Sequence, residues 1–153
     1  MIRVITESAE KQAIAREILE ALTDWFGIAE SREEYIEKSG GQTMIAAFEN
    51  ERPAGFLCLK ETGDATAEIA VMGVRKEYHR RGIGTELFRR AKETAAEQGY
   101  SFLQVKTVQS GRYEEYDRTN MFYRSLGFRE FEVIPDLWDE NNPCQIYVMY
   151  LGN

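Results

Sequence analysis

The sequence predicts a single α/β domain built on one mixed β-sheet. Its 153 residues are enough for one domain with a substantial core, and no internal repeat, low-complexity tract or domain boundary divides them. Segments with the two-residue alternation of strands and segments with the repeat of helices follow one another along the chain. We therefore predict one domain over residues 1–153 with the element order β-α-α-β-β-β-α-β-α-β-β.

The first two elements are predicted as a strand and a helix. Residues 2–6 alternate as a half-buried strand does. Ser8 is placed to cap a helix that runs to about Thr23. The apolar face of this helix consists of Ile14, Ile18, Leu19 and Leu22. These residues recur at helical spacing, so we expect that face to pack on the sheet.

An aromatic turn at residues 24–28 separates this helix from a second one. The second helix is predicted at about residues 31–38, where Ser31 and Glu34 have the spacing of a capping box. Two consecutive glycines, Gly40 and Gly41, then break the helical pattern.

Three strands are predicted next. Residues 43–49 and 55–61 form a hairpin around a turn at 50–53, and a further turn at 62–64 leads to the apolar run 67–74. This last run is predicted to be the central strand, and its apolar part at residues 69–74 is typical of a buried strand.

A basic loop with two glycines follows the central strand and opens the next helix. The apolar face of that helix consists of Ile83, Leu87, Phe88, Ala91 and Ala95, and Gly99 ends it. Positive charge comes from Arg75, Lys76, Arg80 and Arg81. Free N–H groups at a helix start favour a phosphate. We interpret the loop as a pyrophosphate-binding turn, with an ordinary helix start among surface arginines as the alternative.

The last third is predicted as a strand, a helix and two strands. Residues 101–108 form the strand, and the helix runs from about Tyr113 to Leu126 before Gly127. The remaining segments are a strand at 128–134, an irregular loop at 135–143 and a final strand at 145–151.

Composition and charge argue against several classes of protein, namely nucleic-acid-binding, membrane-spanning and metal-binding proteins. The net charge of −7 argues against general nucleic-acid binding. No stretch approaches the ~20 apolar residues of a membrane span, and the start has no signal-type apolar run. Cys58 and Cys144 lack metal-site spacing, so we expect buried reduced thiols, no metal site and a cytoplasmic location.

Two motifs in this chain resemble those of the GNAT superfamily of acetyl-CoA-dependent N-acetyltransferases. The pyrophosphate signature Gln/Arg-x-x-Gly-x-Gly/Ala reads His-Arg-Arg-Gly-Ile-Gly at residues 79–84, with His79 in place of the usual Gln or Arg. The F-Y-x-x-x-G-F element lies at residues 122–128. The resemblance covers nearly the whole chain. It implies a mostly antiparallel sheet splayed at its centre, helices on both faces and acetyl-CoA as cosubstrate.

The resemblance also implies how the cosubstrate is held. It assigns the pyrophosphate to Arg80, Arg81, Gly82, Ile83, Gly84 and Thr85, with His79 as a further cofactor contact. The pantetheine arm is expected along the end of the central strand, at Met72, Gly73 and Val74. Asn120 is a candidate contact with the same arm, and a solvated helix position is its alternative.

Two residues are candidates for proton transfer. The resemblance places Tyr123 near the cofactor sulfur, where it would act as general acid, and a packing aromatic is the alternative. Glu68 is the one carboxylate at the start of the central strand. Burial would raise the pKa of this group and suit a general base, whereas a strand-end Glu in solvent would have no such role.

The acceptor side is expected in the variable segments. The candidates are Trp25, Phe26, Tyr35 and Trp138. Aromatics near carboxylates suit an amine with a further positive charge, whereas Arg112 and Tyr113 would favour a carboxylate-bearing substrate. The predicted function is acetyl transfer to a small-molecule or peptide amine, and the rival is a non-catalytic acyl-CoA sensor. Because dimers are common in the superfamily, a homodimer is considered beside a monomer.

Overall fold

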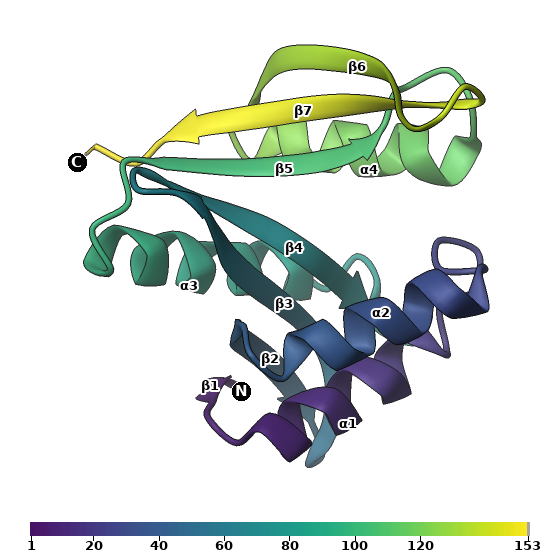
Figure 1. The fold of residues 1–153 in the computed structure, drawn as a ribbon. Coiled ribbons are helices and arrows are strands. Elements are labelled where there is room, and N and C mark those ends of the chain that lie inside the picture. Colours follow the sequence, from purple (N-terminus) through teal and green to yellow (C-terminus); the bar gives the residue numbers. More distant parts are fainter. Residues whose placement is uncertain (153) are drawn as a thin grey trace.

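The computed structural model describes residues 1–152 as a seven-stranded sheet with four α-helices and one short 3-10 helix (Figure 1). In sheet order the strands are β1 (Ile2–Ile5), β2 (Thr43–Glu49), β3 (Arg52–Gly63), β4 (Thr66–Val74), β5 (Phe102–Val108), β7 (Asn142–Tyr150) and β6 (Arg129–Asp139). The helices are α1 (Ser8–Leu19), α2 (Ala29–Ser39), η1 (Lys76–Tyr78), α3 (Ile83–Glu97) and α4 (Glu114–Ser125). The predicted element order is confirmed.

The sheet opens between its two central strands. Strands β4 and β5 form the one parallel pair among the described strands, and they pair over residues 66–69 and 102–105. Beyond that point residues 71–74 pair only with β3, and residues 106–108 pair only with β7. Figure 1 shows β4 and β5 diverging toward their C-terminal ends. The mixed, mostly antiparallel sheet splayed at its centre is confirmed.

Helices cover both faces of this sheet. Ile14 and Ile18 of α1 pack with Phe56 and Val71 in one buried cluster. A second cluster, on the opposite face, joins the apolar residues of α3 to those of α4 and of the sheet, and consists mainly of Leu57, Ile69, Leu87, Ala91, Val105, Tyr123 and Tyr147. Thus α1 and α2 lie on one face and α3 and α4 on the other.

A β-bulge in β4 decides which side chains face which helices. Cys58 pairs with Val71 and the next β3 residue pairs with Ile69, so Ala70 is the extra residue. Ile69 packs in the α3 cluster and Val71 in the α1 cluster, which places Gly73 against α1 as well. A Cβ on Gly73 would lie 3.0 Å from the Leu22 side chain, so the close approach of the segment after α1 explains this glycine.

The predicted helix starts were wrong in detail. Helix α1 has Glu7 as its N-cap and ends at Leu19, and α2 begins at Ala29 after Ile28. Neither N-cap side chain makes a capping hydrogen bond, so Ser8 and the Ser31/Glu34 pair do not cap. After Leu19 the chain tightens into i→i−3 bonds, with the Leu22 N–H donating to the Leu19 carbonyl at 3.1 Å, and the helix stops before Thr23.

The predicted loop at residues 135–143 was also wrong, because β6 and β7 continue into it as a hairpin. The Asp139 carboxylate closes the turn by accepting hydrogen bonds from the Asn141 backbone (2.8 Å) and the Asn142 amide (2.9 Å). Pro135 is tolerated inside β6 because it lies where the β6–β7 register is interrupted, between Ile134 and Asp139, and because β6 is an edge strand. No helix in residues 1–152 has the length and apolar composition needed to cross a membrane.

Candidate active site

The turn between β4 and α3 presents open backbone at the N-terminus of a long helix. Gly82 is the N-cap of α3, with a φ of +80°, a conformation that favours glycine. No atom lies within 4 Å of the position that a Cβ on Gly82 would take. No side chain caps α3, so the first N–H groups of the helix are available to an anion.

Gly84 is a glycine for a different reason. A Cβ there would lie 3.1 Å from Phe122 Cζ of α4 and 3.4 Å from the Met72 side chain. The second glycine of the turn therefore lets α3 and α4 pack closely, and only Gly82 leaves space for a ligand. Of the other predicted contacts, Ile83 is buried and Thr85 is exposed.

Two of the four predicted cations remain available at this turn. Arg80 and Arg81 are exposed, and neither forms an ion pair within residues 1–152. The Arg81 guanidinium lies 5.4 Å from the ring centre of Tyr78. A diphosphate near Gly82 would therefore meet two unpaired guanidinium groups.

The other two cations serve the fold. Arg75 is buried, donates to the Pro53 carbonyl at 2.8 Å and forms an ion pair with Glu17 of α1. Lys76 forms an ion pair with Asp24. The prediction that Arg75 and Lys76 add charge to the ligand turn was therefore wrong.

His79 connects the turn to the end of β4 and to the aromatic segment after α1. Its Nε2 lies 2.7 Å from the Val74 carbonyl oxygen, and because a carbonyl only accepts, Nε2 carries the proton. The edge of the ring meets Trp25 at a centroid distance of 6.0 Å. His79 is thus engaged within the protein, at the position where the family signature has a Gln or Arg.

Met72, Gly73 and Val74 lie in the part of β4 that has no partner on the β5 side. A strand edge without a partner can pair with the amide groups of an extended ligand. Together with the open Gly82 turn and the two free arginines, this edge fits the diphosphate and the amide-bearing arm that the sequence led us to expect.

Tyr123 of α4 is buried on the α3 face of the sheet, with 7% of its surface exposed. Its ring packs against Phe122, Phe128 and Tyr147, with centroid distances of 5.7, 5.7 and 6.1 Å. Its hydroxyl has no hydrogen-bond partner within residues 1–152. Burial, and then the nearby Tyr35 phenol, raise the pKa of Tyr123, so this phenol stays protonated at neutral pH.

Glu68 lies on the other face of the sheet, at the point where β4 and β5 separate. Its side chain is 7% exposed, and its Oε1 accepts a hydrogen bond from Lys106 Nζ at 2.7 Å. Lys106 follows the last β5 residue that pairs with β4, so this ion pair spans the beginning of the gap. Sequence analysis missed Lys106, although its alternation with Val105 would have placed it on the face of Glu68.

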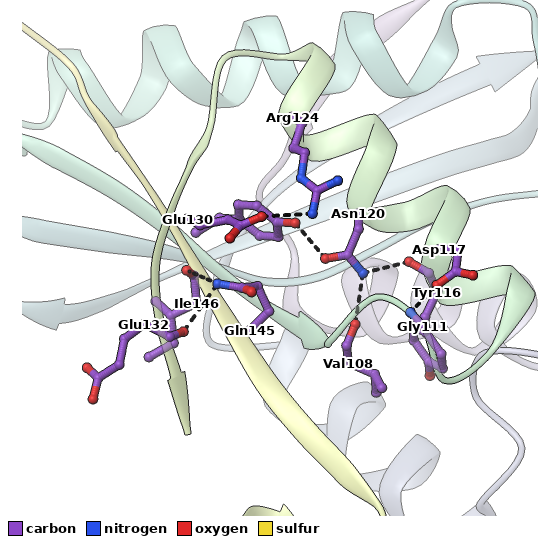
Figure 2. A network of polar contacts seen from close by, with 11 residues as sticks. Val108, Gly111, Tyr116, Asp117, Asn120, Arg124, Glu130, Glu132, Gln145 and Ile146 are labelled. Carbon is purple, nitrogen blue, oxygen red and sulfur yellow. Dashed lines mark hydrogen bonds and ion pairs between the residues drawn. The ribbon is translucent and has the colours of Figure 1, made fainter. Parts of the chain in front are cut away.

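Asn120 makes its hydrogen bonds inside the protein (Figure 2). Its Nδ2 donates to the carbonyls of Val108 (2.8 Å) and Tyr116 (2.7 Å), and its Oδ1 accepts from the Tyr147 hydroxyl (2.6 Å). The residue is 0% exposed. Both amide protons are used, so the structure supports a structural role for Asn120 rather than the predicted contact with the cofactor arm.

Three of the four predicted acceptor residues lie together. The rings of Phe26 and Tyr35 meet edge to face at 5.8 Å, and Trp25 adjoins Phe26 in the chain. Burial and the charges of Glu34 and Glu68 raise the pKa of Tyr35, which therefore lies within electrostatic reach of the ion pair. In the described chain, no ring contact or hydrogen bond joins Trp138 (46% exposed) to this group.

Tyr116 is a further residue of this region that sequence analysis did not single out. Its hydroxyl donates to the Trp25 carbonyl at 3.0 Å and thereby joins α4 to the segment after α1, across the opening of the sheet. Burial raises the pKa of Tyr116. Within residues 1–152 no group of three or more His, Cys, Asp or Glu is arranged to hold a metal ion.

Comparison with known proteins assigns a family to most of the chain. The model of the acetyltransferase (GNAT) family matches residues 12–128. The uncharacterized N-acetyltransferase YsnE of Bacillus subtilis is 27% identical over 100 residues, which are 65% of this chain and 64% of that protein. The match thus spans less than two thirds of that relative's length.

Solved structures share the fold over almost the entire chain. A protein from Desulfovibrio desulfuricans assigned to the GNAT family superposes with a TM-score of 0.83 and 17% identity, over 99% of each chain. An aminoglycoside 6′-N-acetyltransferase complexed with coenzyme A superposes with a TM-score of 0.76 and 16% identity, over 99% of this chain and 98% of the other.

Proposed function

The chain belongs to the acetyltransferase (GNAT) family, and from that premise we propose that it transfers an acetyl group from acetyl-CoA to a primary amine. The acyltransferase class and the cosubstrate predicted from the sequence agree with the family match and with the coenzyme A complex of a structural neighbour. The observation that supports the proposal is the unpaired edge of β4 beside the open Gly82 turn, with Glu68 where β4 and β5 separate and Tyr123 buried on the opposite face of the sheet.

The cosubstrate is held by the turn and the strand edge. The N–H groups around Gly82, with Arg80 and Arg81, bind the diphosphate. The edge of β4 at residues 72–74 binds the pantetheine arm through backbone groups. An arm that runs back along β4 from the turn ends near the bulge at Ala70, next to the end of the parallel pairing at Glu68 and Ile69.

Acetyl transfer to a protonated amine requires the nitrogen to lose two protons and the sulfur to gain one. Glu68 accepts the first proton, which frees the lone pair of the amine for attack on the thioester carbon. As the carbon–sulfur bond breaks, Tyr123 gives its phenolic proton to the departing sulfur and regains one from the attacking nitrogen. Its raised pKa supports this role, because the phenol is protonated when the sulfur leaves.

The remaining features of the proposal follow the sequence predictions. The acceptor is a small-molecule or peptide amine that approaches from the side of Trp25, Phe26 and Tyr35. Residues 1–153 act as one domain, in the cytoplasm. A net charge of −7 supports an acceptor other than nucleic acid.

A thermal-shift titration followed by a thiol-release assay tests the proposal. Acetyl-CoA at about 100 times its Kd should stabilise the protein by roughly 2.7 kcal/mol, and adenosine or desulfo-CoA by less. The double variant Arg80→Ala/Arg81→Ala should lose most of this shift. Arg89→Ala/Arg90→Ala, with the same charge change farther along the exposed side of α3, should keep it.

Two outcomes would contradict the proposal in different ways. No shift with millimolar acetyl-CoA would remove both the transferase and the sensor. A clear shift without thiol release across a broad amine panel would leave a non-catalytic acyl-CoA-binding protein.

A further inference from the structure

The ion pair at the opening of the sheet constrains any proton transfer to Glu68. Glu68 and Lys106 lie 2.7 Å apart with side chains 7% and 28% exposed, and neither has another ion-pair partner within residues 1–152. If Glu68 takes a proton, its charge disappears and the Lys106 ammonium is left partly buried without a counter-ion. A buried charge that loses its partner is strongly unfavourable. A second anion beside Lys106 would keep this ammonium paired while Glu68 holds the proton.

We infer that the acceptor supplies this anion itself: the substrate is an α-amino acid, whose carboxylate binds Lys106 while its amino group meets Glu68. The inference rests on the proposed acetyl transfer and goes beyond it by naming the substrate class. The two charges of an α-amino acid are held on one carbon atom. The ammonium and the carboxylate can therefore bind two protein groups that are themselves in contact, such as Glu68 and Lys106.

The charges balance at each stage of the reaction. Before the reaction the zwitterion brings one positive and one negative group to a pair of opposite charges. When Glu68 takes the first ammonium proton and the nitrogen forms the amide bond, the positive charge of the substrate and the negative charge of Glu68 both disappear. The substrate carboxylate and Lys106 remain as a matched pair. The second proton of the nitrogen leaves through Tyr123 to the sulfur, and Glu68 later releases its proton to water.

The surroundings of the ion pair also fit an amino acid with an apolar or aromatic side chain. The pair faces the side of the sheet that carries Phe26 and Tyr35, because the residues next to it, Ile69 and Val105, pack on the α3 side. Two other charged groups lie near Tyr35 and Glu68. Glu34 pairs with Lys38, and Lys60 is exposed on β3 opposite Glu68.

The test compares amino acids with the amines obtained by removing their carboxylate. L-Phenylalanine is paired with 2-phenylethylamine, L-tyrosine with tyramine and L-tryptophan with tryptamine, and the other common amino acids are treated likewise. For at least one pair, we expect kcat/KM for the amino acid to exceed that of its amine at least 30-fold. Equal or better turnover of the amines would overturn the inference and leave acetyl transfer intact. Acetyl-CoA binding without turnover of any amino acid would also overturn it.

Variants at Lys106 test whether this residue causes the preference for amino acids over the matching amines. Lys106→Met should lower kcat/KM for the amino acid at least 10-fold more than kcat/KM for the matching amine, because only the amino acid carries the carboxylate that Lys106 binds. Lys106→Arg should restore a large part of the amino acid activity. Lys60→Met removes a lysine from the neighbouring strand and should change neither substrate more than twofold. Equal losses for amino acid and amine in Lys106→Met would reduce Lys106 to a structural residue and contradict the inference. If this variant does not fold, the comparison of substrates on the wild-type protein decides.

Discussion

At the scale of single residues, the chemical role of Tyr123 can be tested separately from its structural role. Its ring is packed among three aromatics, but its hydroxyl has no hydrogen-bond partner in the described chain. Removal of the hydroxyl therefore takes away the proposed proton donor and leaves the packing of the ring unchanged.

Tyr123→Phe should lower kcat at least 10-fold, because a positioned acid typically contributes more than this factor. The Kd of acetyl-CoA should stay within twofold and the melting temperature should not fall, since no hydrogen bond is lost. Steady-state kinetics, calorimetric titration and thermal unfolding measure the three quantities. Tyr150→Phe, at an exposed tyrosine of β7, is the matched control and should leave kcat unchanged. A variant with normal kcat would remove Tyr123 from the mechanism.

The sequence indicated the open glycine turn before α3 better than it indicated the partners of the buried polar side chains. Gly82 could be predicted because a left-handed helix start almost requires glycine. Asn120 could not, because its three hydrogen-bond partners come from β5, α4 and β7, and no sequence spacing reveals that they converge on one amide. The same limit applied to Lys106, whose importance depends on a partner 38 residues away.

At the scale of elements, helix α3 has a glycine with positive φ at each end, which allows a matched experiment. Gly82 precedes the helix with φ +80° and Gly99 follows it with φ +91°, and neither would place a Cβ within 4 Å of another atom. A change to alanine at either position forces an L-residue into the left-handed region, at a cost of about 1–2 kcal/mol.

Gly82→Ala and Gly99→Ala should therefore lose similar stability in urea unfolding. Only Gly82→Ala should also weaken acetyl-CoA binding, by 10-fold or more, because its methyl group projects into the open turn. Equal Kd values in the two variants would show that the diphosphate does not approach Gly82, and would redirect the search to Arg80 and Arg81.

The sequence predicted the elements themselves more reliably than their ends. The 3.6-residue repeat of α3 and the alternation of β5 survive in the structure because each has one face in the core. The hairpin of β6 and β7 was mistaken for a loop because Pro135 and the polar residues around Asp139 are typical of turns. An edge strand tolerates both, and sheet order is a tertiary property that local composition does not contain.

At the scale of the whole molecule, the two parts of the sheet are joined by a short parallel pairing and by a contact between loops and helices. Strands β1 to β4 lie on one side of the opening and β5, β7 and β6 on the other, and they pair over residues 66–69 and 102–105 alone. The Tyr116 hydroxyl and the Trp25 carbonyl add a link at the open end. A ligand in the opening would contact both parts at once.

The unpaired edges of β4 and β5 allow a ligand bound in the opening to be detected by hydrogen exchange. Backbone amides of residues 70–74 and 106–108 that point into the gap between β4 and β5 can exchange with deuterium without any unfolding. The amides that are hydrogen-bonded to a neighbouring strand exchange only after local unfolding. Acetyl-CoA should slow deuterium uptake at residues 70–74 at least 10-fold and leave the β2–β3 pairing unchanged, as measured by mass spectrometry of peptic fragments. Uniform slowing across the chain would instead indicate a global gain in stability. Exchange can thus locate the ligand before any acceptor is known.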